Sequence, residues 1–185
     1  MSLLKCSVFI ASSLDGYIAR PDGRIDWLTG AAEKGEDYGY HAFFRSVDCL
    51  VIGRKTYETA LSFGRWPYEG KKVVVMTTNP GPVPDKLAPT VKMILSSPAE
   101  IAGSLRAQGC NHAYIDGGRT IQTFLAAGSI SEMTITTIPI LLGDGIRLFG
   151  KVDADIALRH IETKTYANGI VQTRYAPSRA ASSRG

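Results

Sequence analysis

Short apolar runs recur through the first two-thirds of the chain and alternate with segments of helical character. The runs are too short and too rich in β-branched residues for helices, so we predict them as buried strands. They cover residues 4–11, 49–52, 72–77, 91–95 and 112–115. Between them, helices are predicted over roughly residues 36–47, from residue 53 onward, over residues 97–109, and after residue 117 up to Gly128.

The last third of the chain has the pattern of strands alone. The strands predicted there cover residues 132–140, 156–166 and 170–175. The last two flank Asn168-Gly169, the strongest short-range signal of a β-hairpin. The whole order of elements predicts an α/β fold of three layers: a mostly parallel mixed sheet with helices on both faces, completed by a C-terminal antiparallel hairpin.

Length and composition indicate one globular domain, expected over residues 1–177 and followed by a flexible tail over residues 178–185. The chain has 185 residues, of which 44% are hydrophobic and 21% charged. Its formal net charge is +4, and two of the positive charges, Arg179 and Arg184, lie in the tail. The remaining charge is too weak to predict a nucleic-acid partner, although it is compatible with a phosphorylated small molecule.

The three cysteines are far apart and form neither a CxxC pair nor a Cys/His cluster, so we predict no metal site and no disulfide framework. No apolar run approaches the ~18 residues of a membrane span, and no signal-peptide pattern is present. We therefore expect a soluble cytoplasmic protein that has no membrane partner.

Residues 114–120 (Y-I-D-G-G-R-T) form the first candidate binding motif. A strand that ends in the paired glycines Gly117 and Gly118 allows a ligand, or another backbone, to approach more closely than a Cβ would permit. The helix predicted after them directs its free N–H groups to the same place, which suits an anion such as a pyrophosphate. The alternative is a tight strand-to-helix turn that binds nothing.

A second motif follows the strand at residues 49–52. Gly53 is followed by Arg54, Lys55 and Thr56, which place two cations and a hydroxyl group at a predicted helix N-terminus. This is the chemistry of a phosphate site, unless these side chains are simply solvated. The sequence has no Walker A loop and no G-x-G-x-x-G after a strand, so neither ATP hydrolysis nor a standard Rossmann domain is favoured.

Parallel sheets bind ligands beyond the carboxyl ends of their strands. Three predicted strand ends should therefore face one cleft: Gly53, Thr77 and Asp116.

Asp37 is a candidate for proton transfer, and it lies in the predicted first turn of the helix over residues 36–47. In one interpretation its carboxylate faces an apolar cleft, where desolvation raises its pKa and allows it to deliver a proton. In the other it is a structural charge that stabilises the positive end of the helix dipole.

Four motifs follow one another along the chain and cover residues 13–19 (S-L-D-G-Y-I-A), 51–58 (V-I-G-R-K-T-Y-E), 115–119 (I-D-G-G-R) and 138–145 (I-P-I-L-L-G-D-G). In this order they resemble the dihydrofolate reductase superfamily, and most closely the reductase domain of bacterial riboflavin biosynthesis. The resemblance implies an NADPH-dependent reductase similar to 5-amino-6-(5-phosphoribosylamino)uracil reductase, and a homodimer.

The resemblance also implies which residues form the site. Thirteen positions match the coenzyme contacts of the family: Ala11, Ile18, Gly53, Arg54, Lys55, Thr56, Thr77, Thr78, Asn79, Gly117, Gly118, Arg119 and Thr120. Asp37 falls where dihydrofolate reductases place a substrate-binding carboxylate, and Thr136 falls where they place a hydroxyl group paired with it. The family also joins the two glycines by a cis peptide bond.

Two departures from the riboflavin enzymes bear on the substrate. Those enzymes usually have Glu-Gly-Gly where this chain has Asp116-Gly117-Gly118, and they usually carry arginines around the position of His41, where this chain has only Arg45. We therefore expect a more apolar site for a pterin- or aminopyrimidine-like substrate, which need not be phosphorylated. The alternatives are a dihydrofolate or pterin reductase and a nucleotide-binding regulatory protein without catalytic activity.

Overall fold

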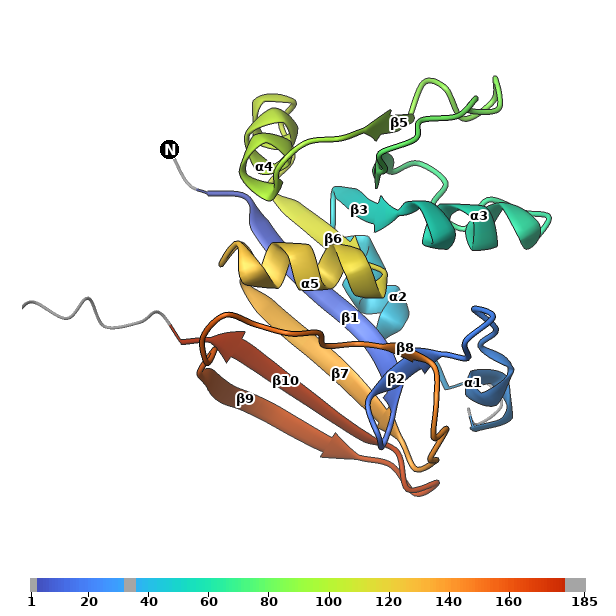
Figure 1. Ribbon diagram of the computed structural model, residues 1–185, viewed down its shortest axis with the longest axis vertical. Helices are drawn as coiled ribbons and strands as arrows, with labels where there is room; N and C mark the ends of the chain where they lie inside the picture. The colour runs from blue at the N-terminus through green and yellow to red at the C-terminus, as the bar shows by residue number, and fades with distance from the viewer. Residues whose placement is uncertain (1–2, 32–35, 179–185) are drawn as a thin grey trace, which may run out of the picture.

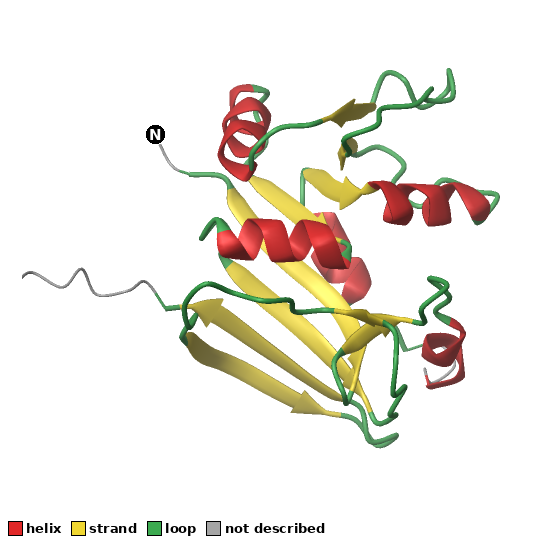
Figure 2. Ribbon diagram, in the orientation of Figure 1, coloured by secondary structure: helices red, strands yellow, loops and turns green. Residues whose placement is uncertain are grey.

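The computed structural model describes residues 3–31 and 36–178, and these residues form ten strands and five helices (Figures 1 and 2). The strands are β1 Lys5–Ser13, β2 Tyr17–Ala19, β3 Cys49–Gly53, β4 Lys72–Met76, β5 Val91–Ile94, β6 His112–Asp116, β7 Glu132–Ile138, β8 Ile146–Arg147, β9 Leu158–Thr165 and β10 Val171–Pro177. The helices are α1 Asp26–Ala31, α2 Tyr40–Ser46, α3 Arg54–Ser62, α4 Pro98–Ala107 and α5 Gly118–Ala126.

Eight of the strands form one sheet in the order β5-β4-β3-β6-β1-β7-β10-β9. All neighbours from β5 to β7 pair in parallel, and β10 is antiparallel to both β7 and β9. This confirms the predicted mostly parallel sheet and its C-terminal hairpin. The parallel strands all end at the same edge of the sheet, so that edge brings together residues from distant parts of the chain.

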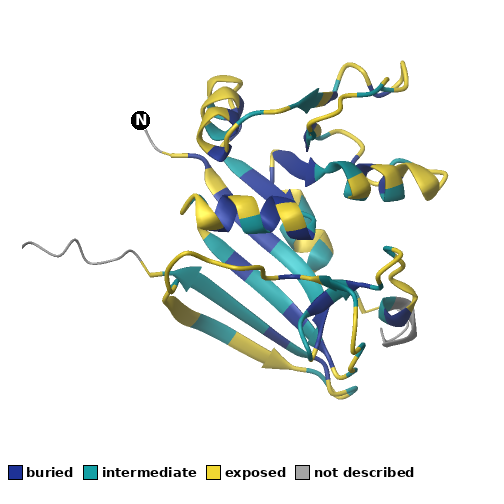
Figure 3. Ribbon diagram, in the orientation of Figure 1, coloured by how far each residue is buried: buried dark blue, intermediate teal, exposed yellow. Residues whose placement is uncertain are grey.

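Apolar side chains cover both faces of the sheet because consecutive strand residues point in opposite directions. On one face, Val51 of β3 packs with residues of α4 and α5. On the other, Leu50 and Ile52 pack with residues of α2 and α3. Figure 1 accordingly shows α5 in front of β1 and α2 behind it. The central strands are largely buried, whereas the edge strand β9 is mostly exposed (Figure 3).

The structure corrects the predicted start of the helix over residues 36–47. Helix α2 begins only at Tyr40, because Tyr38 and Gly39 have positive φ angles of 53° and 83°. This left-handed conformation cannot continue into a right-handed helix. Asp37 therefore precedes the helix and does not lie in its first turn.

The sequence pattern also did not predict helix α1 or a second sheet of two short strands, in which β2 pairs antiparallel with β8. Strands of three and two residues are too short to show an alternating pattern. This small sheet brings residues 17–19 and 146–147 against the start of α5.

The predicted tail lies outside the described residues except for Ser178, whose N–H donates to the carbonyl of Ala157 at 2.7 Å. In the described part of the chain, no helix is long and apolar enough to cross a membrane. The same residues contain no cluster of His, Cys, Asp and Glu side chains that could hold a metal ion. Cys6, Cys49 and Cys110 are free and buried.

Candidate functional site

A cavity of about 1130 Å³ lies along the carboxyl edge of the sheet. It is lined by the ends of β3 and β6, by residues that follow β4, and by side chains of β1 and β7. Pockets for single small molecules are usually ~300–1,000 Å³. The cavity is therefore large enough for a ligand bigger than a typical small molecule, or for two ligands together.

Thirteen of the fifteen residues predicted for the site line this cavity. They are Ala11, Ile18, Asp37, Gly53, Arg54, Lys55, Thr56, Thr77, Thr78, Gly117, Gly118, Arg119 and Thr136. Asn79 and Thr120 do not. The backbone carbonyl of Asn79 instead accepts hydrogen bonds from Arg54 and Thr77. Thr120 is buried, with its hydroxyl oxygen 3.1 Å from where a Cβ on Gly53 would lie.

One end of the cavity is cationic. Helices α3 and α5 both begin there, and their first turns carry Arg54, Lys55 and Arg119. Arg54 is held in place, because its Nε donates to Glu58 at 2.6 Å and its Nη1 donates to the carbonyl of Asn79 at 3.0 Å. Lys55 and Arg119 are exposed. Two helix N-termini and three cations together favour a multiply charged anion.

The two glycines are required by contacts within the protein itself. A Cβ on Gly117, which has φ 90°, would lie 2.5 Å from the hydroxyl oxygen of Thr56. A Cβ on Gly118 would lie 3.0 Å from Ile18 and 3.1 Å from the carbonyl of Arg147. The glycines thus let α3 and the small sheet approach the start of α5. No described peptide bond is cis, so the cis bond implied by the resemblance is absent here.

The other end of the cavity is aromatic and acidic. Its wall includes Phe9, Tyr38, Tyr40 and Tyr114, together with the acidic residues Glu36 and Asp37. The ring of Phe9 lies edge-on to that of Tyr40, with centroids 5.9 Å apart. Every Lys and Arg side chain among the described lining residues belongs to the cationic end. An uncharged or amino-bearing ring suits this aromatic end better than a phosphate does.

Asp116 is a candidate functional group that sequence reasoning placed in the cleft without giving it a role. One of its carboxylate oxygens accepts a hydrogen bond from the N–H of Gly117 at 2.8 Å. Desolvation outweighs this bond and raises the pKa of Asp116 to about 6. Burial and, secondarily, the charge of Asp116 raise the pKa of Tyr40 to about 12. A carboxyl group with a pKa near neutrality can exchange a proton at physiological pH.

The structure contradicts the raised pKa proposed for Asp37. Its two carboxylate oxygens accept hydrogen bonds from the N–H groups of Gly39 and His41, at 2.9 and 2.8 Å. The imidazole of His41 lies 2.6 Å away. These contacts, with the backbone N–H of His41 foremost, lower the pKa of Asp37. The carboxylate has the environment of a charge that caps the start of α2, as in the second of the two interpretations.

Thr136 faces the same cavity but does not pair with Asp37 in the described residues. Its hydroxyl oxygen instead accepts a hydrogen bond from the side-chain amide of Gln172 at 2.9 Å. The same amide nitrogen donates to the backbone carbonyl of Tyr38 at 2.9 Å. Gln172 thereby connects β7, β10 and the segment before α2 at the aromatic end.

Comparison with known proteins identifies relatives that match this chain over nearly its whole length. The chain is 40% identical in sequence to a putative riboflavin biosynthesis protein from Shewanella sp. PV-4, whose crystal structure is known. The two structures align with a TM-score of 0.89 over 95% of this chain and 100% of that one. It is 34% identical to the uncharacterized protein YwjB of Bacillus subtilis (strain 168), over 90% of this chain and 94% of the relative.

A more distant structure has the same fold. Dihydrofolate reductase from Enterococcus faecalis, complexed with NADP(H) and RAB-propyl, aligns with a TM-score of 0.62 at 17% identity, over 95% of this chain and 97% of that one. The family model of the RibD C-terminal domain matches residues 5–172. The chain therefore belongs to the RibD C-terminal domain family and has the dihydrofolate reductase-like fold.

Proposed function

We propose that the protein is an NADPH-dependent reductase of a small nitrogen heterocycle, pterin- or aminopyrimidine-like, that carries no phosphate. The observation that carries this proposal is the division of one cavity into a cationic end and an aromatic, acidic end. The first suits the phosphates of a dinucleotide, and the second suits a flat ring. Family membership and the NADP(H) complex of the Enterococcus enzyme support it.

The residues present fit NADPH in a specific way. Arg54, Lys55 and Arg119 would hold its phosphates, together with the hydroxyl groups of Thr56, Thr77 and Thr78. Ala11 and Ile18, which line the same cavity, would lie beside its nicotinamide, as the family resemblance implies. When bound, this coenzyme supplies a hydride, and the protein supplies position, exclusion of water and a proton.

Asp116 is the group that we assign to the proton. Its carboxyl group lines the cavity just before the start of α5, and its charge helps to raise the pKa of Tyr40 and Tyr114 at the aromatic end. Its own pKa is raised to about 6, so roughly a tenth of the group is protonated at pH 7. Asp37 then has a positioning role: it holds the start of α2 and, through it, the aromatic wall at Tyr40. Thr136 and Gln172 hold the same wall from the sheet.

The experiment is a coenzyme oxidation assay of the purified protein with NADPH or NADH against pterins, aminopyrimidines and aldehydes. We expect oxidation of NADPH with at least one heterocycle, and calorimetry should show that NADPH binds more tightly than NADH. Binding without oxidation across the panel would favour the regulatory alternative. If calorimetry detects no NADPH binding at millimolar concentration, the proposal fails.

We further propose, from the family resemblance, that the protein is a cytoplasmic homodimer. Strand β9 ends the eight-stranded sheet, and its outer edge is free of a neighbour among the described strands. Such an edge can pair with a second copy. Sedimentation at micromolar concentration tests this: a monomer at all concentrations would contradict the proposed dimer.

A further inference from the structure

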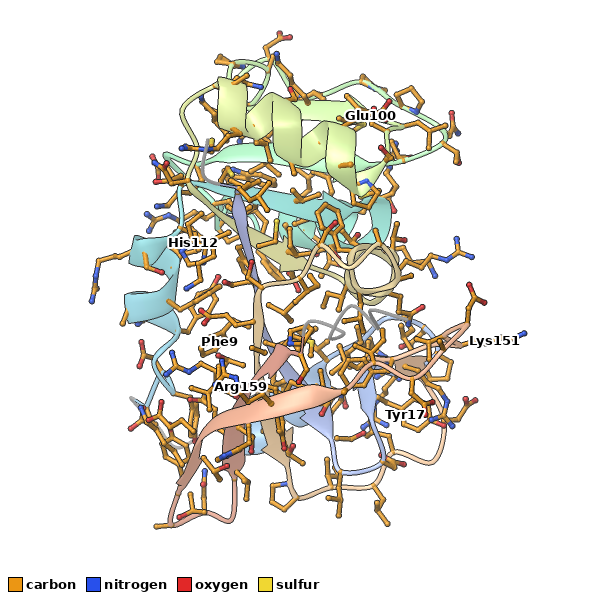
Figure 4. The ribbon with its side chains drawn as sticks, turned by 90° about the vertical axis from the view of Figure 1, so that its left-hand side faces the viewer. Phe9, Tyr17, Glu100, His112, Lys151 and Arg159 are labelled. Carbon is orange, nitrogen blue, oxygen red and sulfur yellow. The ribbon has the colours of Figure 1, made fainter. Side chains whose placement is uncertain are left out.

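A second cavity, of about 430 Å³, adjoins the aromatic end of the first. It lies between α2 and the strands β7, β10 and β9, and its floor is polar. Lys5 pairs with Glu132 at 2.7 Å, and Arg174 pairs with Glu162 at 3.2 Å. In Figure 4, Phe9 is labelled between α2, at the left, and the C-terminal strands below it.

Two side chains, Tyr38 and Phe9, line both cavities. The chain itself crosses the boundary at this point: Asp37 and Tyr40 line only the large cavity, and Gly39 lines only the small one. The rings of Tyr38 and Phe9 therefore form the partition between an aromatic chamber and a charged one.

Tyr38 is held in this position against its backbone preference. Among the described residues it is the only one other than glycine with a positive φ, 53°. Such conformations persist where the surroundings over-determine them, and they cluster at functional sites. A bulky side chain in a left-handed conformation thus marks a place where the position of the ring matters.

Three contacts from the hairpin fix Tyr38. Its hydroxyl group accepts a hydrogen bond from the side-chain amide of Asn168 at 2.8 Å, and its ring lies edge-on to Tyr166 with centroids 4.8 Å apart. Its backbone carbonyl accepts from Gln172 at 2.9 Å. A substituent that crossed the partition would have to displace the ring and break these contacts.

We propose that Tyr38 is a specificity-determining residue, whose ring closes the substrate chamber and limits it to compact rings without a long substituent in this direction. The inference rests on the proposed function, because it takes the aromatic end as the substrate site. It adds the class of substrate: one whose ring system ends at Tyr38 and does not extend into the charged cavity.

The test is calorimetry with two probes, diaminopyrimidine and benzyl-diaminopyrimidine, on the protein alone. The wild type should prefer the smaller probe. Tyr38→Ala should shift the ratio of the two affinities toward the larger probe by at least about tenfold, because the phenyl ring of that probe becomes buried only when the partition is open. Phe9→Ala opens the same partition from β1 and should shift the ratio in the same direction.

Two variants serve as controls. Tyr38→Phe keeps the ring and should keep the wild-type ratio. Tyr175→Ala removes a half-buried ring of β10 that lines neither cavity, and it should leave the ratio unchanged. Circular dichroism identifies any variant that does not fold, and if Tyr38→Ala is one of them, Phe9→Ala decides the question.

An unchanged ratio of affinities in folded Tyr38→Ala and Phe9→Ala would overturn the inference. An equal shift of the ratio in Tyr175→Ala would also overturn it, and so would the finding that the wild-type protein binds neither probe. These failures are separate from failure of the proposed function, which is decided by the binding and oxidation of NADPH.

Discussion

The carboxylate of Asp15 accepts hydrogen bonds from the backbone N–H groups of Leu142 and Gly143, at 3.1 and 2.8 Å, although these residues lie 127 and 128 positions further along the chain. The hydroxyl group of Ser13 donates to the same carboxylate at 2.5 Å. Two of the four motifs that carry the family resemblance are thus joined by one side chain. Their role is to fix the small sheet that places Ile18 in the cavity.

Asp15→Asn should lower the stability of the protein at neutral pH but not at low pH. The hydrogen bond from Ser13, followed by those from the two backbone N–H groups, lowers the pKa of Asp15 to about 2. A depressed folded-state pKa stabilises the protein above the unfolded pKa near ~4, and the contribution is lost as the pH falls toward 2. Urea unfolding from pH 7 to pH 2 measures this. Asp85→Asn, at an exposed loop carboxylate, is the control.

Asp116→Asn should lower turnover by about 10²–10⁴-fold while leaving NADPH binding intact. The protonated carboxyl is the active form, so wild-type turnover should decline as the pH rises above about 6. The variant should lack this decline. A variant with wild-type turnover and the same pH profile would remove Asp116 from proton delivery.

The same substitution should stabilise the folded protein at pH 7. A raised folded-state pKa means that ionisation opposes folding, so wild-type stability should fall as the pH rises from ~4 to about 6 and stay level above that. Asp116→Asn removes this penalty and should raise the melting temperature at pH 7 by a few degrees, since ~1 kcal/mol shifts it by roughly 2–4 °C in a domain of this size. Equal melting temperatures at pH 7 would contradict the buried charge.

Asp37→Asn distinguishes positioning from proton transfer. The carboxylate of Asp37 accepts hydrogen bonds from two backbone N–H groups at the start of α2. We therefore expect the variant to have a lower melting temperature and a raised KM, with a smaller effect on kcat. Our sequence-based interpretation of a proton donor instead requires a loss of turnover of about 10²–10⁴-fold. A folded variant with that loss and an unchanged KM would restore Asp37 as the proton source.

Arg54→Ala should weaken NADPH binding far more than NADH binding. A charge-assisted contact with the phosphate that NADPH carries and NADH lacks is worth ~1.5–3 kcal/mol, which corresponds to a roughly tenfold to hundredfold change in affinity. Arg65→Ala is the matched control, because Arg65 is exposed and pairs with Glu69 away from the cavity. Equal weakening of the two coenzymes would contradict the assignment of Arg54.

Gly117→Ala should destabilise the protein, because the new Cβ meets Thr56 and the residue must keep φ 90°. Thr56→Ala removes the hydroxyl oxygen that the Cβ would meet. The double variant should therefore be more stable than the sum of the single effects predicts, with a coupling of ~0.5–3 kcal/mol. Strict additivity in urea unfolding would show that backbone strain alone causes the loss.

Much of the fold was predictable because most of the parallel strands are short apolar runs, and Asn168-Gly169 marks the hairpin. The cationic end was predictable for a related reason, since helix N-termini follow strand ends directly in the chain. The environments of Asp37 and Asp116 were not predictable from the sequence. The environment of Asp37 depends on the left-handed conformations of Tyr38 and Gly39. The raised pKa of Asp116 depends on its burial in the folded protein. Neither leaves a local signal in the sequence.

The bridge made by Gln172 has a consequence for the order in which the protein is assembled. All the residues of the cationic end have been synthesised once Arg119 has left the ribosome, but the wall at Tyr38 and Thr136 waits for β10. A chain stalled between these points would contain every residue of the cationic end but would lack Gln172, which connects Tyr38 with Thr136. The aromatic end of the cavity is therefore the last part of the site to be synthesised in full.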